Sequence, residues 1–321
     1  MKKDITISGI KVSPGQDAHI NLNIARLPSR TPIDIPVFVS RAEENGPVLL
    51  LLAGLHGDEI NGIEIIRRIL RKGFNKPLKG TVICVPVMNI YGFLNFSRDL
   101  PDGKDVNRSF PGSKSGSLAS RVAHRLMNEI IPKIDYGIDF HTGGASRANF
   151  PQIRCLVNDE LNKKLALAFS PPFILNSVYR PNSLRKESAN LGKRIIVYEA
   201  GESMRFDRDA IILGINGVRR VMKYLGMTNH VHPPEADPKI IMKATWVRAR
   251  YSGLFHYFVQ NGKYVEKNQL IGAITDPFGD FYSQIKSPVS GHIVGVNNNP
   301  VVNQGDALIH IGLEEMEKEF G

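Results

Sequence analysis

Residues 47–59 read PVLLLLAGLHGDE, an unbroken apolar run that leads into a glycine, a histidine and two acidic residues. A run of this kind without polar alternation is typical of a strand buried on both faces of a sheet. His56 follows the end of that strand, and Glu59 stands one helical turn further on, at the start of the next helix. We expect both side chains at the carboxyl edge of the sheet, where open α/β proteins usually hold their sites.

A third candidate ligand, His141, lies in DFHTGG at residues 139–144, at the end of a second strand-like run over 136–140. Two imidazoles and one carboxylate suit a catalytic zinc, because three protein ligands leave a fourth position free. The pattern therefore predicts one Zn²⁺ per chain, held by His56, Glu59 and His141. The plainer alternative is that His56 and Glu59 only cap a helix and that His141 is a satisfied core histidine.

From residue 47 to about residue 225, strand-like and helix-like segments alternate along the chain. The predicted strands are Val48–Ala53, Thr81–Val87, Tyr136–Phe140, Arg154–Val157 and Arg194–Glu199. The predicted helices are Glu59–Arg71, Ser117–Ile131, Asn158–Phe169, Leu184–Leu191 and Asp207–Tyr224. This alternation, preceded by short β-like stretches in the first 45 residues, indicates an α/β domain over residues 1–227. Its sheet is expected to be mostly parallel or mixed, with helices on both faces.

The chain changes character after that domain. Residues 228–238 contain three prolines and are predicted to be a linker, in which His230 and His232 are solvated. Residues 239–313 are predicted to form an all-β, barrel-like module of short strands and tight turns, and 314–321 an acidic tail. An internal duplication makes the module resemble biotinyl and lipoyl domains. Its central hairpin, residues 275–282, has no lysine, so we expect a structural lid or docking element rather than a carrier.

Bulk composition narrows the function classes. The chain has 321 residues, 42% hydrophobic and 22% charged, and no apolar run long enough to span a bilayer. Without an N-terminal signal core, a cytoplasmic protein is expected. Cys84 and Cys155 lie in apolar runs and are expected to be buried thiols. The net charge of +10 is dispersed, which disfavours nucleic acid and favours steering of a small anionic substrate. The oligomeric state stays open, with a homo-oligomer among the alternatives.

Two further segments carry candidate chemistry. Residues 98–112 are rich in turn formers and contain Asn107 and Arg108, whose planar guanidinium suits bidentate pairing with a carboxylate. The alternative is a solvated turn. Glu199 ends an apolar strand-like run, and a carboxylate on the same rim as a metal is suited to act as a general base. The alternative for Glu199 is a helix cap, and Glu202 begins the next loop.

Together, the motifs GLHGDE at 54–59, DVNRSFPG at 105–112 and DFHTG at 139–143 resemble those of the succinylglutamate desuccinylase/aspartoacylase family, within the zinc carboxypeptidase-like fold. The resemblance runs from about residue 47 to residue 312. It implies a zinc site, a pair that holds the substrate carboxylate, a general base and an arginine that polarises the scissile carbonyl. By this resemblance the zinc ligands are His56, Glu59 and His141, and the substrate carboxylate is held by Asn107 and Arg108. The general base is Glu199, and the polarising arginine is Arg98. Candidates for a specificity arginine are Arg154, Arg180 and Arg185.

The leading functional prediction is a zinc-dependent hydrolase that cleaves the amide bond of a small, anionic N-acyl amino acid. A second prediction uses the same residues in a metallocarboxypeptidase acting on peptide C-termini. A third, of another class, is a non-catalytic carboxylate-binding or scaffold protein. It is disfavoured because every predicted catalytic position carries a residue competent for the chemistry.

Overall fold

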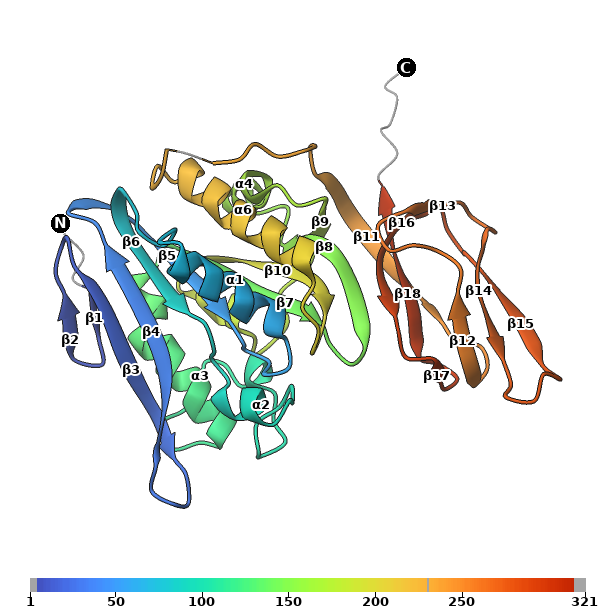
Figure 1. Ribbon diagram of the computed structural model, residues 1–321, viewed down its shortest axis with the longest axis horizontal. Helices are drawn as coiled ribbons and strands as arrows, with labels where there is room; N and C mark the ends of the chain where they lie inside the picture. The colour runs from blue at the N-terminus through green and yellow to red at the C-terminus, as the bar shows by residue number, and fades with distance from the viewer. Residues whose placement is uncertain (1–4, 230, 315–321) are drawn as a thin grey trace.

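The computed structural model describes residues 5–229 and 231–314 and contains a long mixed sheet flanked by helices (Figure 1). The strands are β1 Ile5–Ile7, β2 Ile10–Val12, β3 Asp17–Arg26, β4 Pro32–Arg41, β5 Glu44–Ala53, β6 Lys79–Val85, β7 Tyr136–Gly143, β8 Arg147–Cys155, β9 Phe173–Asn176, β10 Arg194–Glu202, β11 Lys239–Arg248, β12 Gly253–Tyr257, β13 Tyr264–Val265, β14 Leu270–Thr275, β15 Tyr282–Lys286, β16 Gly291–Asn297, β17 Val301–Val302 and β18 Ala307–Glu314. The helices are α1 Ile60–Arg71, α2 Ile90–Leu94, α3 Leu118–Glu129, α4 Glu160–Phe169, α5 Leu184–Asn190 and α6 Arg208–Tyr224, with 3-10 turns η1 Val106–Arg108 and η2 Ile131–Lys133.

The apolar run of β5 explains why the sheet is covered on both sides. Leu50 and Leu52 point into a core shared with α3, whereas Leu49 and Leu51 point into a second core shared with α1, α4 and α6. All four leucine side chains are fully buried. Because successive residues of a strand face opposite sides, a strand between two helical layers needs apolar residues at every position. The predicted burial of this run and the predicted helices on both faces are confirmed.

The direction of the strands depends on the part of the sheet. From β5 to β10, four of the five neighbouring pairs are parallel: β6 with β5, β5 with β7, β7 with β10, and β8 with β9. The exception is β8, which runs antiparallel to β10. Antiparallel strands are added at both ends of the sheet, β4 and β3 on one side and β18, β16 and β13 on the other. The whole sheet is therefore mixed, and only its centre is mostly parallel.

Each predicted strand and helix between residues 47 and 225 overlaps an observed one. The buried thiols Cys84 and Cys155 are also confirmed. Three elements were missed: the five-residue helix α2, the 3-10 turn η1, and the strand β9, which is four residues long and follows two prolines. The fourth predicted strand begins too late, because β8 already starts at Arg147. Its first half has no local apolar signal and is fixed by pairing with strands far away in the sequence.

The C-terminal β strands form a second core. A four-stranded sheet in the order β15, β14, β12, β17 packs against β11, β13, β16 and β18 of the long sheet. The β14–β15 connection is the predicted hairpin without lysine. The likeness to biotinyl and lipoyl domains stays a prediction. Glu314, assigned to the tail from sequence, is the last residue of β18. His230 and residues 315–321 lie outside the described residues.

The C-terminal strands, although they stand to one side in Figure 1, are joined to the α/β part by backbone hydrogen bonds along a shared boundary. In the long sheet β11 pairs in parallel with β9, and β16 pairs antiparallel with the first half of β8. Side chains reinforce this boundary: the amides of Gln152 and Asn261 donate to the carbonyls of Val294 and Ala148 at 3.2 and 3.0 Å. We call the β8–β16 and β9–β11 boundary the seam.

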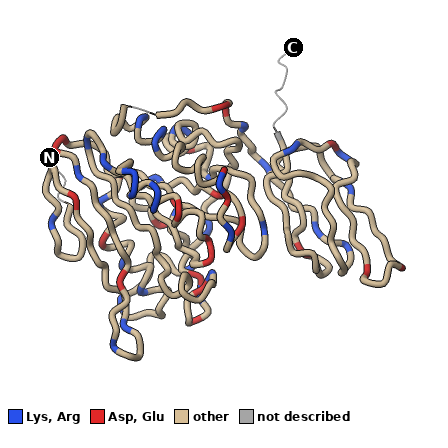
Figure 2. Tube along the Cα trace, viewed as in Figure 1, with Lys and Arg blue, Asp and Glu red and all other residues tan. Residues whose placement is uncertain are grey.

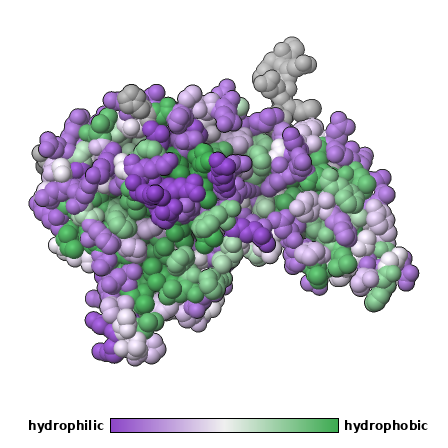
Figure 3. Space-filling model, in the orientation of Figure 1, coloured by the Kyte–Doolittle hydropathy of each residue, from purple (hydrophilic) through white to green (hydrophobic). Residues whose placement is uncertain are grey.

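The surface bears on possible partners. Basic residues are distributed over the whole trace rather than gathered in one stripe (Figure 2). On the face seen in Figure 3, hydrophilic side chains cover α1, and more hydrophobic ones lie over the C-terminal strands. Among the described residues, no helix has the length and apolar character needed to cross a membrane.

The seam predicts a difference between two glycine substitutions. Gly262 and Gly279 both have positive φ, +87° and +92°, so alanine strains both backbones alike. A Cβ at Gly262 would lie 2.5 Å from the ring of Phe150 on β8, whereas nothing lies within 4 Å at Gly279. We expect Gly262→Ala to lose about 1–3 kcal/mol more than Gly279→Ala, the usual cost of overpacking. Urea unfolding of both variants measures this, and equal midpoints would contradict tight packing across the seam.

Candidate metal centre and active site

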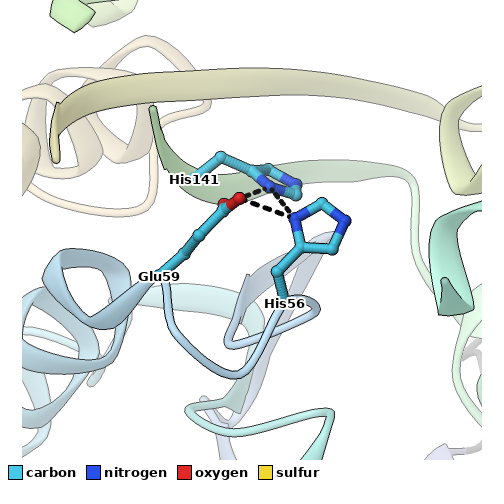
Figure 4. A group of neighbouring side chains, drawn as sticks. All are labelled: His56, Glu59 and His141. Carbon is cyan, nitrogen blue, oxygen red and sulfur yellow. Dashed lines mark hydrogen bonds and ion pairs between the residues drawn. The ribbon is translucent and has the colours of Figure 1, made fainter. Parts of the chain in front are cut away.

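The three predicted metal ligands converge at the carboxyl edge of the parallel strands (Figure 4). His56 lies in the turn after β5, Glu59 is the first residue before α1, and His141 lies near the end of β7. Their exposed fractions are 3%, 2% and 6%. One ligand atom from each lies within 4.8 Å of the others, a group that is able to hold a metal ion. The parallel pairing of β5 with β7 brings residues so distant in sequence together.

Glu59 does not act as a helix cap. Its carboxylate makes no capping bond to α1 and instead turns towards the two histidines. Oε1 lies 2.8 Å from Nδ1 of His56, and Oε2 lies 2.7 Å from Nδ1 of His141. Oε2 also accepts a hydrogen bond from the amide of Thr142 at 3.1 Å. The capping alternative is therefore wrong for this residue.

The donor set fits a cation because of what holds the far side of each ring. Nε2 of His141 lies 2.8 Å from the Asp139 carboxylate, and Nε2 of His56 lies 3.2 Å from Asp105. Such carboxylate partners hold the proton on the outer nitrogen of a metal-binding histidine. The inner nitrogens then present lone pairs to Glu59 and to each other, 3.2 Å apart. Three converging acceptors repel one another unless positive charge lies among them.

The pKa shifts of His141 and Glu59 also indicate that positive charge is needed among the three side chains. Burial alone would lower the pKa of His141, but the Asp139 and Glu59 carboxylates outweigh it and hold the pKa well above its ordinary value. Burial likewise opposes charge on Glu59, yet the neighbouring His56 and His141 hold the pKa of that carboxyl far below its usual range. A buried carboxylate between two imidazoles thus stays ionised and calls for a proton or a metal cation beside it.

Asp105 joins three parts of the site, and sequence reasoning did not single it out. Besides His56, it accepts a hydrogen bond from Nη2 of Arg98 at 2.8 Å and from the backbone amide of Asn107 at 2.7 Å. Arg98 in turn places Nη1 3.2 Å from Nδ1 of His56 and 3.3 Å from Glu59. Arg98 therefore belongs to the centre. Asp105 and Asp139 both stand inside the quoted motifs, two residues before Asn107 and His141, but nothing local indicated their contacts.

Asn107 and Arg108 lie in the 3-10 turn η1, beside the centre. The Asn107 side-chain oxygen accepts a hydrogen bond from the amide of Leu184 at 3.0 Å, which leaves its NH₂ group available as a donor. Burial lowers the pKa of Arg108. The charge of Asp105 opposes this shift, and the charges of Arg180 and Arg98 add to it. The pair is thus a fixed amide donor next to a guanidinium that donates to the Asn107 carbonyl at 2.6 Å and has no hydrogen bond to a carboxylate among the described residues.

Glu199 lies beside His141 in the register of β10 and β7. Both residues line the same cavity. The Glu199 carboxylate accepts a hydrogen bond from Asn149 at 2.6 Å and pairs with Arg154 at 3.0 Å. It caps no helix, so that alternative is excluded. Glu202, by contrast, bonds to Asn298 beyond the seam at 2.8 Å.

All seven predicted site residues line one cavity of about 570 Å³. The candidate specificity arginines also line it, but they differ. Arg185 is committed to the structure, because it donates to the carbonyls of Arg154, Ser177 and Val178. Arg154 pairs with Glu199. Arg180 is exposed and has no side-chain hydrogen bond within the described ranges. The cavity also takes wall residues from beyond the seam that sequence reasoning missed, namely Trp246, Arg248, Gly305, Asp306 and Ala307.

Comparison with known proteins yields a consistent group of relatives. Residues 45–225, more than half of the chain, match the succinylglutamate desuccinylase/aspartoacylase catalytic domain. The N-alpha-acetyl-L-2,4-diaminobutyric acid deacetylase of Halomonas elongata is 26% identical over 254 residues, which cover 75% of this chain and 74% of that enzyme.

Two solved structures share the fold along almost the whole chain. A succinylglutamate desuccinylase/aspartoacylase from Rhodobacter sphaeroides has a TM-score of 0.82 at 24% identity, with 93% of this chain and 95% of that chain covered. The product-bound ectoine utilization protein EutE (DoeB) from Ruegeria pomeroyi has a TM-score of 0.84 at 21% identity, with 98% and 99% covered. The C-terminal strands are therefore part of a fold that these structures also possess.

The position of Asp105 predicts that Asp105→Asn weakens metal binding. The substitution removes the charge that holds His56 and Arg98, and loss of such a partner typically lowers metal affinity by about 10- to 100-fold. Competition with a chromophoric chelator measures the affinity. Asp102→Asn is the matched control, because Asp102 lies in the same loop but, among the described residues, accepts only from the backbone amides of Lys104 and Ala119. Equal affinities for the two variants would remove Asp105 from this role.

Proposed function

The chain belongs to the succinylglutamate desuccinylase/aspartoacylase family, and on that basis we propose that it hydrolyses the amide bond of a small N-acyl amino acid. The related Halomonas elongata enzyme is named as a deacetylase of an N-acetyl amino acid, which supports this reaction class. A cavity of about 570 Å³ has the size of a small-molecule site.

One observation carries the proposal: a buried group of two histidines and a glutamate shares a cavity with the guanidinium of Arg108 and a strand-end carboxylate. His56, Glu59 and His141 would hold one Zn²⁺, because nitrogen and carboxylate donors in threes are the typical set for a catalytic zinc. When bound, zinc would supply the Lewis acidity that makes water a competent nucleophile near neutral pH. The remaining steps fall to the protein's own groups.

Glu199 would move the proton. Its carboxylate oxygen takes a proton from the attacking water and returns it to the leaving amide nitrogen, which departs as a free amine. Asn149 and Arg154 hold this carboxylate by its Oε2 atom, so Oε1 is left for the proton transfer. The carboxylate that takes the proton is therefore fixed in place before the substrate arrives.

The remaining polar groups would hold and polarise the substrate. Arg98 lies against Glu59 and His56, so its guanidinium is placed to donate to the scissile carbonyl oxygen as negative charge develops there. Asn107 and Arg108 would hold the α-carboxylate, the amide through its NH₂ group and the guanidinium through its planar fork. Residues 1–227 would thus carry the chemistry, and residues 239–313 would shape one wall of the cavity.

A hydrolysis screen of N-acetyl- and N-succinyl-amino acids with zinc-loaded protein tests the proposal. We expect release of the free amino acid, one Zn²⁺ per chain, and loss of both in His141→Ala, because that ligand is removed. His256→Ala is the control: His256 is exposed on β12, where its ring is hydrogen-bonded to Thr275. Metal content by atomic emission, together with amine release, gives the answer. Stoichiometric zinc in His141→Ala would show that the ligand assignment is wrong.

Glu199→Gln should retain zinc and lose about 10²- to 10⁴-fold in kcat, because glutamine cannot accept the proton that a general base takes. Glu202→Gln is a matched control at the end of the same strand, three residues away, where the carboxylate bonds to Asn298 instead of lying in the cavity wall. Steady-state kinetics on any substrate found in the screen compares the two. A kcat within a few-fold of wild type for Glu199→Gln would exclude it as the base.

A further inference from the structure

The strand that carries the proposed general base is irregular immediately after it. Glu199 of β10 lies beside His141 of β7, and Glu202 lies beside Gly143, so three steps along β10 match two along β7. The pairing of β10 with β8 also shifts here, between Glu199 and Gly201. A bulge of this kind bends the strand and changes the direction of neighbouring side chains, and bulges are common next to active sites. The direction of Glu199 therefore depends on what holds the residues after it.

Asn61, the second residue of α1, holds this bulge with both ends of its side-chain amide. Nδ2 donates to the carbonyl of Ala200 at 3.2 Å, and Oδ1 accepts from the backbone amide of Asp207 at 3.0 Å. The side chain is 1% exposed. Loss of either bond would leave a buried polar group without a partner, which is costly. The amide of Asn61 thus fixes the two ends of the segment from Ala200 to Asp207.

The backbone at the bulge is shaped around this amide. Gly201 has a φ of +77°, a conformation that favours glycine, and a Cβ at this position would lie 2.4 Å from Nδ2 of Asn61. Further along the segment, the amide of Met204 donates to the carbonyl of Asp58 at 2.9 Å. The residues after the bulge are therefore held by the same stretch of chain that supplies two of the proposed metal ligands.

The side chains next to the bulge face two directions. Tyr198 and Ala200 lie in the buried core shared with α1, α4 and α6. Since successive residues of a strand face opposite sides, Glu199 between them points to the other side, where it lines the cavity. Asn61 is not part of the cavity wall, and both of the hydrogen bonds described above go to backbone atoms. Any influence of Asn61 on Glu199 is therefore transmitted by the backbone of β10.

We infer that Asn61 is a positioning residue for the proposed general base: by holding the bulge, it sets the direction in which Glu199 extends into the cavity. The inference rests on the proposed function, since it gives Asn61 a part in the same proton transfer. Asn149 and Arg154 fix the carboxylate of Glu199 from the side of β8. Asn61 fixes the backbone from which that side chain extends, so the two sets of contacts act at opposite ends of it.

Two other roles for Asn61 predict different results. A purely structural role would change the free energy of unfolding and leave kcat unchanged. Because Asn61 stands two residues after Glu59, it would alter the zinc content if it acted through that ligand. Action through Glu199 lowers kcat, keeps the zinc, and depends on the presence of the Glu199 carboxylate.

Asn61→Ala tests the inference in the zinc-loaded protein, with any substrate found in the hydrolysis screen. We expect kcat to fall by about 10- to 100-fold, because a displacement of about 1 Å at a reacting group costs up to about 100-fold. KM and zinc content should stay near their wild-type values. Asn75→Ala is the matched control, since Asn75 is 7% exposed, donates to Ser40 at 2.7 Å and lies outside the cavity wall. Equal kcat values for the two variants would overturn the inference.

A double-mutant cycle separates action through Glu199 from action elsewhere. Residues that work as a unit have effects that do not add. Asn61→Ala should therefore lower kcat in the wild-type background and have little further effect in Glu199→Gln. The same fold loss in both backgrounds, or loss of zinc from Asn61→Ala, would reject the assignment.

Gly201→Ala displaces the same amide without removing it, so it tests the inference even where Asn61→Ala does not fold. Gly192→Ala is the control, because Gly192 has a similar φ of +73° but nothing within 4 Å of an added Cβ. Alanine strains both backbones alike. We expect a loss of kcat in Gly201→Ala alone, and equal kcat values would contradict the role of the bulge.

Failure of the proposed function would look different, because no substrate would then be cleaved by the wild-type protein. Crystal structures of the wild type and of Asn61→Ala still decide the inference in that case. In the variant we expect a changed register of β10 after Glu199 and loss of the hydrogen bond from Asn149 to the Glu199 carboxylate. An unchanged register with that bond intact would reject Asn61 as a positioning residue.

Discussion

The arrangement of the whole site depends on one buried carboxylate, that of Glu59, between two imidazole nitrogens. An ionised group with 2% exposure is stable only when matched by positive charge and hydrogen bonds. The Thr142 amide and Arg98 supply part of this compensation. The converging lone pairs of the histidines leave a place among the three side chains for a cation. The turn after β5, the start of α1 and the end of β7 place the three side chains around that position.

Backbone pairing between neighbouring strands connects this centre to the rest of the sheet. His141 on β7 lies beside Glu199 on β10, Glu199 lies beside Gln152 on β8, and Asn149 of β8 pairs with Gly295 of β16. Ligand, carboxylate and seam are therefore linked by continuous backbone pairing, which permits little independent movement. A rim formed by loops alone would be more variable, since loops are the mobile parts of a fold. The C-terminal strands act as a fixed wall of the cavity, not as a tethered module.

Local sequence patterns were sufficient to predict β5, the surrounding helices and the grouping of His56, Glu59 and His141. These features depend on periodicity and on residues that adjoin strand ends. The seam was not predictable in this way, because β8 and β16 are distant in sequence and the first half of β8 has no distinctive pattern. Arg185 shows a second limit: sequence suggested a specificity residue, but burial commits its donors to backbone carbonyls. The contacts of Asp105 and Asp139 likewise arise only when distant rings meet them.

The distribution of charge separates catalysis from recognition. Around the centre, Glu59, Asp105 and Asp139 face two histidines and Arg98, so a dipositive ion bound there would be met by three nearby carboxylates. The unmatched guanidinium groups lie on the walls instead, in η1 and at the seam. Arginine suits those positions because its fork fixes the direction of a carboxylate and its flat face packs on an aromatic ring, as Arg147 does on Trp246. A substrate held by these walls would be oriented at the centre before any bond is broken, and such orientation lowers the barrier of the reaction.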